Sequence, residues 1–239
     1  MKNIDILVFG AHPDDVELGC SGTILLQISL GYKVGVIDLT RGELGTRGSV
    51  DIRNSEAQIA SEKMGISFRE NLDFKDGFFD NNEKNRLEII KRIRHYQPKI
   101  ILCNAPDDRH PDHGRGANLV FDASFLSGLE KIVTNYNGSV QIPYRPNVLY
   151  HYIQYKDLKP DFIVDISSFM NQKMDIINSY KSQFYNPASN EKETLISQKN
   201  FLEIITNKAS DLGRFISADY AEGFIVRRYI GVDDLFNII

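Results

Sequence analysis

The 239-residue sequence has few cysteines and no long apolar run. Its two cysteines, Cys20 and Cys103, stand in apolar stretches, so we expect buried thiols and no disulfide framework. This cysteine usage is typical of a reducing cytoplasm. No apolar run reaches membrane-spanning length, and the N-terminal residues lack the apolar core of a signal peptide. We therefore expect a cytoplasmic protein with no membrane partner.

The sequence also lacks a run of charges of one sign. Its formal net charge is −4, from 28 basic and 32 acidic residues. Proteins that bind nucleic acids or membrane surfaces usually carry a basic face, so this balance argues against both classes. Hydrophobic residues make up 42% of the chain and charged residues 25%, as in an ordinary soluble globular protein. The length predicts a single domain over residues 1–239.

Strand and helix patterns alternate along the chain. An apolar run over residues 4–9 predicts a buried strand, and apolar residues then recur at every fourth position over 16–28, as on one helix face. Further expected strands are 33–39, 66–72, 99–104, 148–154 and 162–166, and further expected helices are 51–64, 83–97, 113–126, 168–184 and 191–209. Residues 127–147 are irregular, and 220–229 are expected to close one side of the domain. This alternation predicts βαβ units on a mostly parallel sheet, hence an α/β fold.

A histidine and two carboxylates occupy the turn between the first strand and the first helix. The turn is Gly10-Ala11-His12-Pro13-Asp14-Asp15. In an open α/β sheet it lies at the carboxyl edge of the strands, where ligands bind. His12 and Asp15 are three residues apart, so both can face one point. The alternative is helix capping, in which Asp14 or Asp15 accepts the first helical N–H groups.

A second turn of this kind, residues 105–114, follows the strand at 99–104 and contains His110 and His113. If the two strands are neighbours, His12, Asp15 and His113 converge. Two imidazoles and one carboxylate leave a fourth position open, which is typical of a catalytic zinc site. Three of the five histidines fall in these two turns, and this favours a metal site over capping.

Asp14 and His110 then remain without a ligand role. Asp14 is adjacent to Asp15 and can accept the proton of a metal-bound water as general base. His110 lies three residues before His113, and a protonated imidazole there would stabilise an oxyanion or protonate a leaving amine. These are the parts of metal-assisted hydrolysis. Asp112 is interpreted as an N-cap or as a residue that orients a histidine.

The motifs Ala11-His12-Pro13-Asp14-Asp15 and His110-Pro111-Asp112-His113 resemble the two signatures of the zinc-dependent N-acetylglucosamine-type deacetylases, the PIG-L or LmbE-like superfamily. Shorter blocks, spread over nearly the whole chain, resemble the bacillithiol-biosynthesis branch of that superfamily. These blocks are Asp38-Leu39-Thr40, Arg53-Asn54-Ser55-Glu56, Asp108-Arg109-His110, Tyr180-Lys181-Ser182-Gln183-Phe184 and Tyr220-Ala221-Glu222-Gly223-Phe224.

The resemblance implies a Rossmann-like three-layer fold with the active site at the carboxyl edge of the strands. It implies removal of the acetyl group from an N-acetylglucosaminyl conjugate, N-acetylglucosaminyl malate in the branch. It assigns zinc to His12, Asp15 and His113, the base role to Asp14 and the electrostatic role to His110. Iron(II) is an alternative metal, because both ions accept N and O ligands. The resemblance also suggests a homo-oligomer, with a hexamer as one candidate, and 127–147 is where we expect the subunit contact.

Two alternatives to this activity stay open. One is the same chemistry on another substrate, such as a chitobiose-type, phosphatidylinositol or mycothiol-like conjugate. The other is a metal- or sugar-binding module without turnover. The presence of both Asp14 and His110 argues against that module, because binding alone requires neither.

The resemblance further assigns Arg53 and Arg109 to the malate carboxylates, which guanidinium groups bind bidentately. The alternative for Arg53 is a surface ion pair with Glu56, three residues on. Arg145 resembles an active-site arginine supplied to a neighbouring subunit.

Two features depart from the pattern of the branch. Phe201 stands where some members carry a tyrosine that is expected to assist at the oxyanion. The loop Gly42–Gly48 also differs, and it is either a mobile lid over the sugar or a surface loop whose glycines permit turns.

Overall fold

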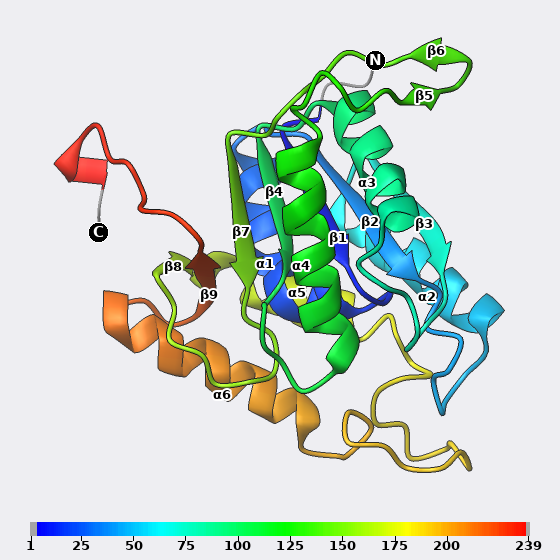
Figure 1. The fold of residues 1–239 in the computed structure, drawn as a ribbon. Helices are drawn as coiled ribbons and strands as arrows, with labels where there is room; N and C mark the ends of the chain where they lie inside the picture. The colour runs from blue at the N-terminus through cyan, green and yellow to red at the C-terminus, as the bar shows by residue number, and fades with distance from the viewer. Residues whose placement is uncertain (1–3, 238–239) are drawn as a thin grey trace.

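A computed structural model describes residues 4–237. Its main sheet has seven strands in the order β3-β2-β1-β4-β7-β9-β8 (Figure 1). These strands are β1 (Ile6–Gly10), β2 (Val34–Thr40), β3 (Phe68–Phe74), β4 (Ile100–Asn104), β7 (Val148–Tyr152), β8 (Phe162–Asp165) and β9 (Ala221–Val226). Within the irregular stretch expected at 127–147, β5 (Asn135–Tyr136) and β6 (Ser139–Val140) form a small antiparallel hairpin.

In the part of the chain that the structure describes, six α-helices connect and cover the strands. They are α1 (Asp15–Ser29), α2 (Val50–Met64), α3 (Glu83–Tyr96), α4 (Pro111–Leu126), α5 (Met170–Ile177) and α6 (Phe201–Gly213). Short 3-10 turns cover Ser167–Phe169, Arg214–Ile216 and Leu235–Asn237. Over residues 4–237, no helix has the length and apolar character that a membrane crossing requires.

The pairing of the strands confirms an α/β fold with a mostly parallel sheet. β1 pairs in parallel with β2 and β4, β2 with β3, and β4 with β7, whereas β9 is antiparallel to both β7 and β8. Strand residues alternate between two cores: Val8 and Val36 pack with α1, α2, α5 and α6 on one face, and Leu7 and Phe9 pack with α3 and α4 on the other. The result is three layers, helix on sheet on helix (Figure 1).

The adjacency of β1 and β4 positions the site. Val8 of β1 pairs with Leu102 of β4, so the two strands end at the same edge of the sheet. The turns that follow them are therefore neighbours, as the sequence argument required. Cys20 and Cys103 are buried free thiols, which confirms their expected structural setting.

Residues 178–200 contradict the expected helices at 168–184 and 191–209. The helices are shorter, α5 ends at Ile177 and α6 begins at Phe201, and the chain between them is irregular. Its contacts are with distant parts of the chain: Tyr180 donates to Glu17 (2.9 Å), and the Ser182 N–H donates to Glu56 (2.7 Å). Local periodicity carries no information about such contacts. The helix ranges predicted from it therefore reach too far into residues 178–200.

Helix α1 is broken at Cys20, where φ is −150°. The N–H groups of Gly22 and Thr23 lose their helical partners at this break, and both donate to the carboxylate of Glu222 on β9, at 3.0 and 2.7 Å. The ammonium of Lys173 on α5 lies 2.6 Å from the same carboxylate. A buried ion pair thus joins α1, α5 and β9.

Candidate active site

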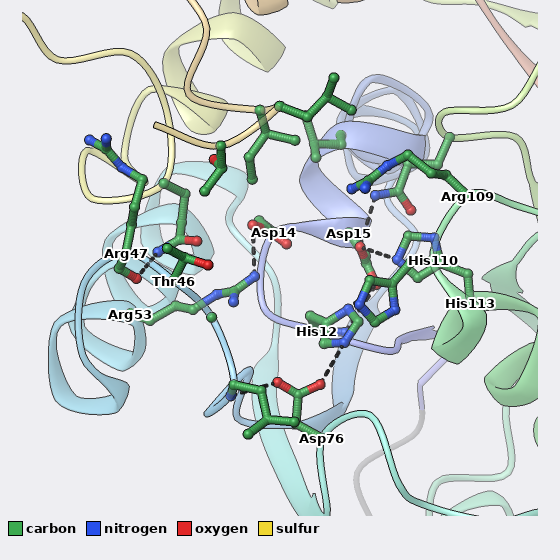
Figure 2. A pocket seen from close by; sticks show the side chains of 18 of the residues that line it. His12, Asp14, Asp15, Thr46, Arg47, Arg53, Asp76, Arg109, His110 and His113 are labelled. Atoms are coloured by element: carbon green, nitrogen blue, oxygen red, sulfur yellow. Dashed lines mark hydrogen bonds and ion pairs between the residues drawn. The ribbon is translucent and has the colours of Figure 1, made fainter. Parts of the chain in front are cut away.

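A pocket of about 310 Å³ opens at the carboxyl ends of β1 and β4. The seven residues expected from sequence to hold the metal, to take part in proton transfer or to bind the malate carboxylates all line it (Figure 2), and these are His12, Asp14, Asp15, Arg53, Arg109, His110 and His113. The two turns supply the imidazoles and carboxylates, and α2 supplies Arg53. The structure therefore brings together residues that are up to 101 positions apart, between His12 and His113.

Asp15 lies between the two imidazoles expected to be metal ligands. Its carboxylate is 3.4 Å from Nδ1 of His12 and 3.1 Å from Nε2 of His113. Ring nitrogens of His12, His110 and His113 also lie within 4.8 Å of one another. Donors at these separations can share one small cation.

The other nitrogen of each imidazole faces a buried carboxylate. Nε2 of His12 is 3.0 Å from Asp76, and Nδ1 of His113 is 2.7 Å from Asp108. Such carboxylate partners fix the ring orientation of histidines that bind metals. This role was not predicted from sequence for either aspartate. For Asp76, the available signal was its position just beyond β3, at the same edge of the sheet.

Two side-chain amides and one backbone amide hold Asp15 in place. Asn104 at the end of β4 donates to one oxygen (3.1 Å), and Gln154, just beyond β7, donates to the other (2.8 Å). The N–H of His12 donates to the same carboxylate at 3.0 Å. The hydrogen bonds from Asn104 and Gln154 to Asp15 were not predicted either, because they depend on which strands are neighbours in the sheet.

The capping alternative does not hold for Asp14. It occupies the N-cap position of α1 without a side-chain cap, and its φ is 119°, in the left-handed region that non-glycine residues rarely adopt. Its carboxylate accepts a 2.8 Å hydrogen bond from Arg53, whose Nε also donates to the carbonyl of Pro13 (2.9 Å). Burial raises the pKa of Asp14 to about 6, although Arg53 lowers it. The alternative Arg53–Glu56 pair is absent, because Glu56 binds Ser182 instead.

His110 caps α4. Its Nδ1 accepts the N–H of Asp112 at 3.3 Å, so the ring presents Nε2 as its donor. Burial and the positive charge of His12 and His113 lower the pKa of His110, which favours a neutral imidazole over the protonated one expected from sequence. Asp112 is not the N-cap; it is fully buried and lies 3.4 Å from Nε2 of His12.

The electrostatics of the site favour a bound cation. Burial alone would lower the pKa of His113, but Asp15 and Asp108 raise it to about 9. For His12 too, burial is outweighed by Asp112, Asp15 and Asp76, which raise its pKa well above the usual range. Carboxylates that stabilise a proton here will also stabilise a divalent metal ion, and mixed N and O donors suit zinc or iron.

The loop Gly42–Gly48 forms one wall of the pocket, and several of its residues donate hydrogen bonds to residues outside the loop. The Leu44 N–H donates to Asp76 (2.9 Å), Arg47 Nε donates to the carbonyl of Ser182 (2.9 Å), and the Gly48 N–H donates to Glu191 (2.8 Å). The loop is thus joined both to the carboxylate that orients His12 and to the irregular segment 178–200.

Of three further residues that the resemblance singles out, Phe201 and Arg145 lie outside the pocket and Arg109 lines it. Phe201 is buried against Phe184, with ring centroids 5.9 Å apart, and is not among the residues that line the pocket. Arg145 lies over the ring of Phe125, also away from the pocket. Arg109 lines the pocket, is exposed, and its guanidinium lies 5.3 Å from the ring of Tyr155.

Fold and site together define an α/β protein with a candidate metal centre at the carboxyl edge of its parallel strands. A family model described as PIG-L, GlcNAc-PI de-N-acetylase, matches residues 7–124. A diacetylchitobiose deacetylase from Thermococcus kodakarensis is 32% identical over 190 residues, 75% of this chain and 70% of the relative. The chain therefore belongs to the PIG-L family of deacetylases.

Two further relatives bear on the structure and the branch. The crystal structure of a conserved protein from Thermus thermophilus has a TM-score of 0.85 and 32% identity, and the match covers 96% of this chain and 98% of that one. A probable N-acetyl-alpha-D-glucosaminyl L-malate deacetylase from Bacillus anthracis is 28% identical over 137 residues, 52% of this chain and 61% of the relative.

Proposed function

We propose that this protein is a metal-dependent N-deacetylase of N-acetylglucosaminyl conjugates, with zinc held by His12, Asp15 and His113. The observation that carries the proposal is the convergence of these three donors with Asp14 and His110 on one pocket. Iron(II) remains the alternative ion, since the donor set suits both. When bound, the metal supplies Lewis acidity toward a carbonyl oxygen and toward water.

The chain's own residues perform the proton transfers. Asp14, ionised and held by Arg53, accepts the proton of the attacking water and then donates it to the amide nitrogen, which leaves as the free amine when the C–N bond breaks. His110 donates an Nε2–H hydrogen bond to the oxygen of the acetamide as negative charge develops there. Asp76 and Asp108 keep the two imidazole ligands in orientation, and the amides of Asn104 and Gln154 do the same for Asp15.

For the substrate, we propose N-acetylglucosaminyl malate first. Arginines in the pocket favour an anionic conjugate, because guanidinium groups bind carboxylates well. Arg109 is exposed at the pocket and free to take this part, whereas Arg53 is already bound to Asp14. The malate deacetylase relative supports this choice. The chitobiose deacetylase relative supports a second candidate, a neutral N-acetylated disaccharide.

The test is release of free amine from each of the two substrates by the zinc-loaded protein, with and without a chelator. Chelator-sensitive turnover of the malate conjugate, faster than that of N,N′-diacetylchitobiose, is the expected result. The reverse preference would assign the second substrate. Absence of turnover with zinc and with iron would favour the binding module and overturn the enzyme proposal. Size-exclusion chromatography of the same sample tests the proposed homo-oligomer.

A further inference from the structure

Gln183 is a buried glutamine in the pocket wall whose amide orientation is fixed by its partners. Only 4% of the residue is exposed. Its Nε2 donates to the carbonyl of Arg47 and to the hydroxyl of Ser182, at 2.9 Å each. A carbonyl can only accept a hydrogen bond, so the nitrogen of the amide must face Arg47 and cannot exchange places with the oxygen.

Ser182 is held in its turn by α2. Its N–H and its hydroxyl both donate to the carboxylate of Glu56, at 2.7 Å each. Because the hydrogen of the hydroxyl is used there, the hydroxyl oxygen accepts the bond from Gln183. Both hydrogens of the Gln183 amide thus have partners, and these partners hold the side chain in one orientation.

The oxygen of the same amide has no partner. Among residues 4–237, no group donates to Oε1 of Gln183, and this atom, unlike Nη2 of Arg47, is not shut off from the surface. Gln183 lines the pocket, so its oxygen is open to the pocket. An acceptor in so enclosed a position gains most from a donor on a bound molecule, because leaving it unpaired is unfavourable.

The chemistry of the conjugate identifies that donor. The acetamide must lie at the imidazoles, and Figure 2 shows Arg47, to which Gln183 is bonded, on the opposite side of Asp14. The carboxylates of a malate group have no hydrogen to donate, whereas the hydroxyls of the sugar do. From the proposed function, on which this step rests, we infer that Oε1 of Gln183 accepts a hydrogen bond from a sugar hydroxyl of N-acetylglucosamine. Gln183 then selects for the sugar, whichever group the sugar carries at its anomeric carbon.

The experiment compares N-acetylglucosaminyl malate with three analogues, each of which lacks a different free hydroxyl of the sugar. In the wild-type protein we expect one analogue to lose about 10–100-fold in kcat/KM, because a buried acceptor is then left unpaired. Gln183→Met keeps the length of the side chain and removes the amide. This variant should turn over the same analogue about as well as the parent conjugate, since the hydroxyl no longer has a partner to lose.

Ser182→Ala is the matched control, because it disturbs the same network but leaves Oε1 of Gln183 and the bond to the Arg47 carbonyl in place. It should discriminate against the analogue as strongly as wild type does, whatever its absolute turnover. Equal turnover of all three analogues by the wild-type protein would overturn the inference, and this measurement requires no variant. Unchanged discrimination in Gln183→Met would overturn it too. If the wild-type protein deacetylates none of the four compounds, the proposed function fails, and calorimetric binding of the same compounds to wild type and Gln183→Met still tests Gln183.

Discussion

Asp14 combines a left-handed backbone, a buried carboxylate and an ion pair with Arg53. Backbone strain of this kind persists only where surrounding contacts hold it, and it concentrates at functional sites. The consequence is that its carboxylate is turned away from the helix it precedes and toward the pocket. A capping residue would have the opposite arrangement.

We expect Asp14→Asn to lower kcat by about 10²–10⁴-fold, as for loss of a general base, while metal content stays that of wild type. Elemental analysis of the purified variant measures the metal, and amine release measures turnover. Asp73→Asn is the control, because Asp73 also has a positive φ but is exposed and lies outside the pocket. Full turnover by a metal-loaded Asp14→Asn protein would remove the base role.

His151 does not line the pocket, so it provides a test of folding stability that is independent of the reaction. It is fully buried, contacts the carbonyl of Asn104 and lies beside Arg227, and burial lowers its pKa to about 4. In the unfolded chain a histidine has a pKa near 6.5, so the unfolded state binds the proton first as pH falls. The buried neutral imidazole of His151 therefore makes its full contribution to the unfolding free energy above pH 6.5. This contribution is lost as pH falls from 6.5 toward 4.

Between pH 7.5 and pH 5, wild type should lose about 2 kcal/mol more unfolding free energy than His151→Asn, given these two pKa values. Urea unfolding of both proteins at the two pH values measures the difference. Parallel losses in the two proteins would show that His151 does not carry this acid sensitivity.

At the scale of elements, α1 depends on a partner from the far end of the chain. The N–H groups freed by its break at Cys20 are bound by Glu222 of β9, and Lys173 of α5 neutralises that carboxylate. Removing one member of a buried ion pair leaves an uncompensated charge, which costs more than removing both.

We expect Glu222→Gln to lower the unfolding free energy by about 3–5 kcal/mol, since the ammonium of Lys173 is left without a counter-charge. The double variant Glu222→Gln, Lys173→Met should recover part of this loss. Thermal unfolding of wild type, both single variants and the double variant gives the coupling between the two residues. If the double variant loses more unfolding free energy than the two single variants lose together, the proposed pairing is contradicted.

Elements with strong local patterns could be predicted from sequence, and those held by distant contacts could not. The strand at 99–104 and the helix at 83–97 were located to within one or two residues, because apolar periodicity and Pro98 define them locally. The irregular segment 178–200 depends on Glu17, Glu56 and the loop Gly42–Gly48, so no local pattern reveals it.

The same distinction applies to the site. His12, Asp15 and His113 could be selected because ligand-type residues at strand ends are visible in sequence, and only the adjacency of β1 and β4 had to be assumed. Their orienting partners, Asp76 and Asn104 among them, look like ordinary turn and strand-end residues until the tertiary fold places them.

At the scale of the whole molecule, the metal centre and the fold should be thermodynamically linked. Carboxylates and imidazoles from the segments that follow β1, β3 and β4 surround one point, and an unfolded chain cannot present them together. A ligand that binds only the folded state at 1,000 times its Kd adds about 4 kcal/mol of stability. For a chain of this length that corresponds to a Tm increase of about 10 °C.

We therefore expect zinc to raise the Tm of the chelator-treated wild-type protein by about this amount, and Asp15→Asn to abolish the increase because a ligand is lost. Asp107→Asn is the matched control. Asp107 lies in the β4–α4 connection, and its exposed carboxylate is paired with Lys156, beyond β7, so the zinc response of this variant should equal that of wild type. Differential scanning calorimetry with and without zinc measures all three proteins. An equal increase in Asp15→Asn would place the bound ion elsewhere, because a cation centred between His12 and His113 needs the carboxylate that lies between them.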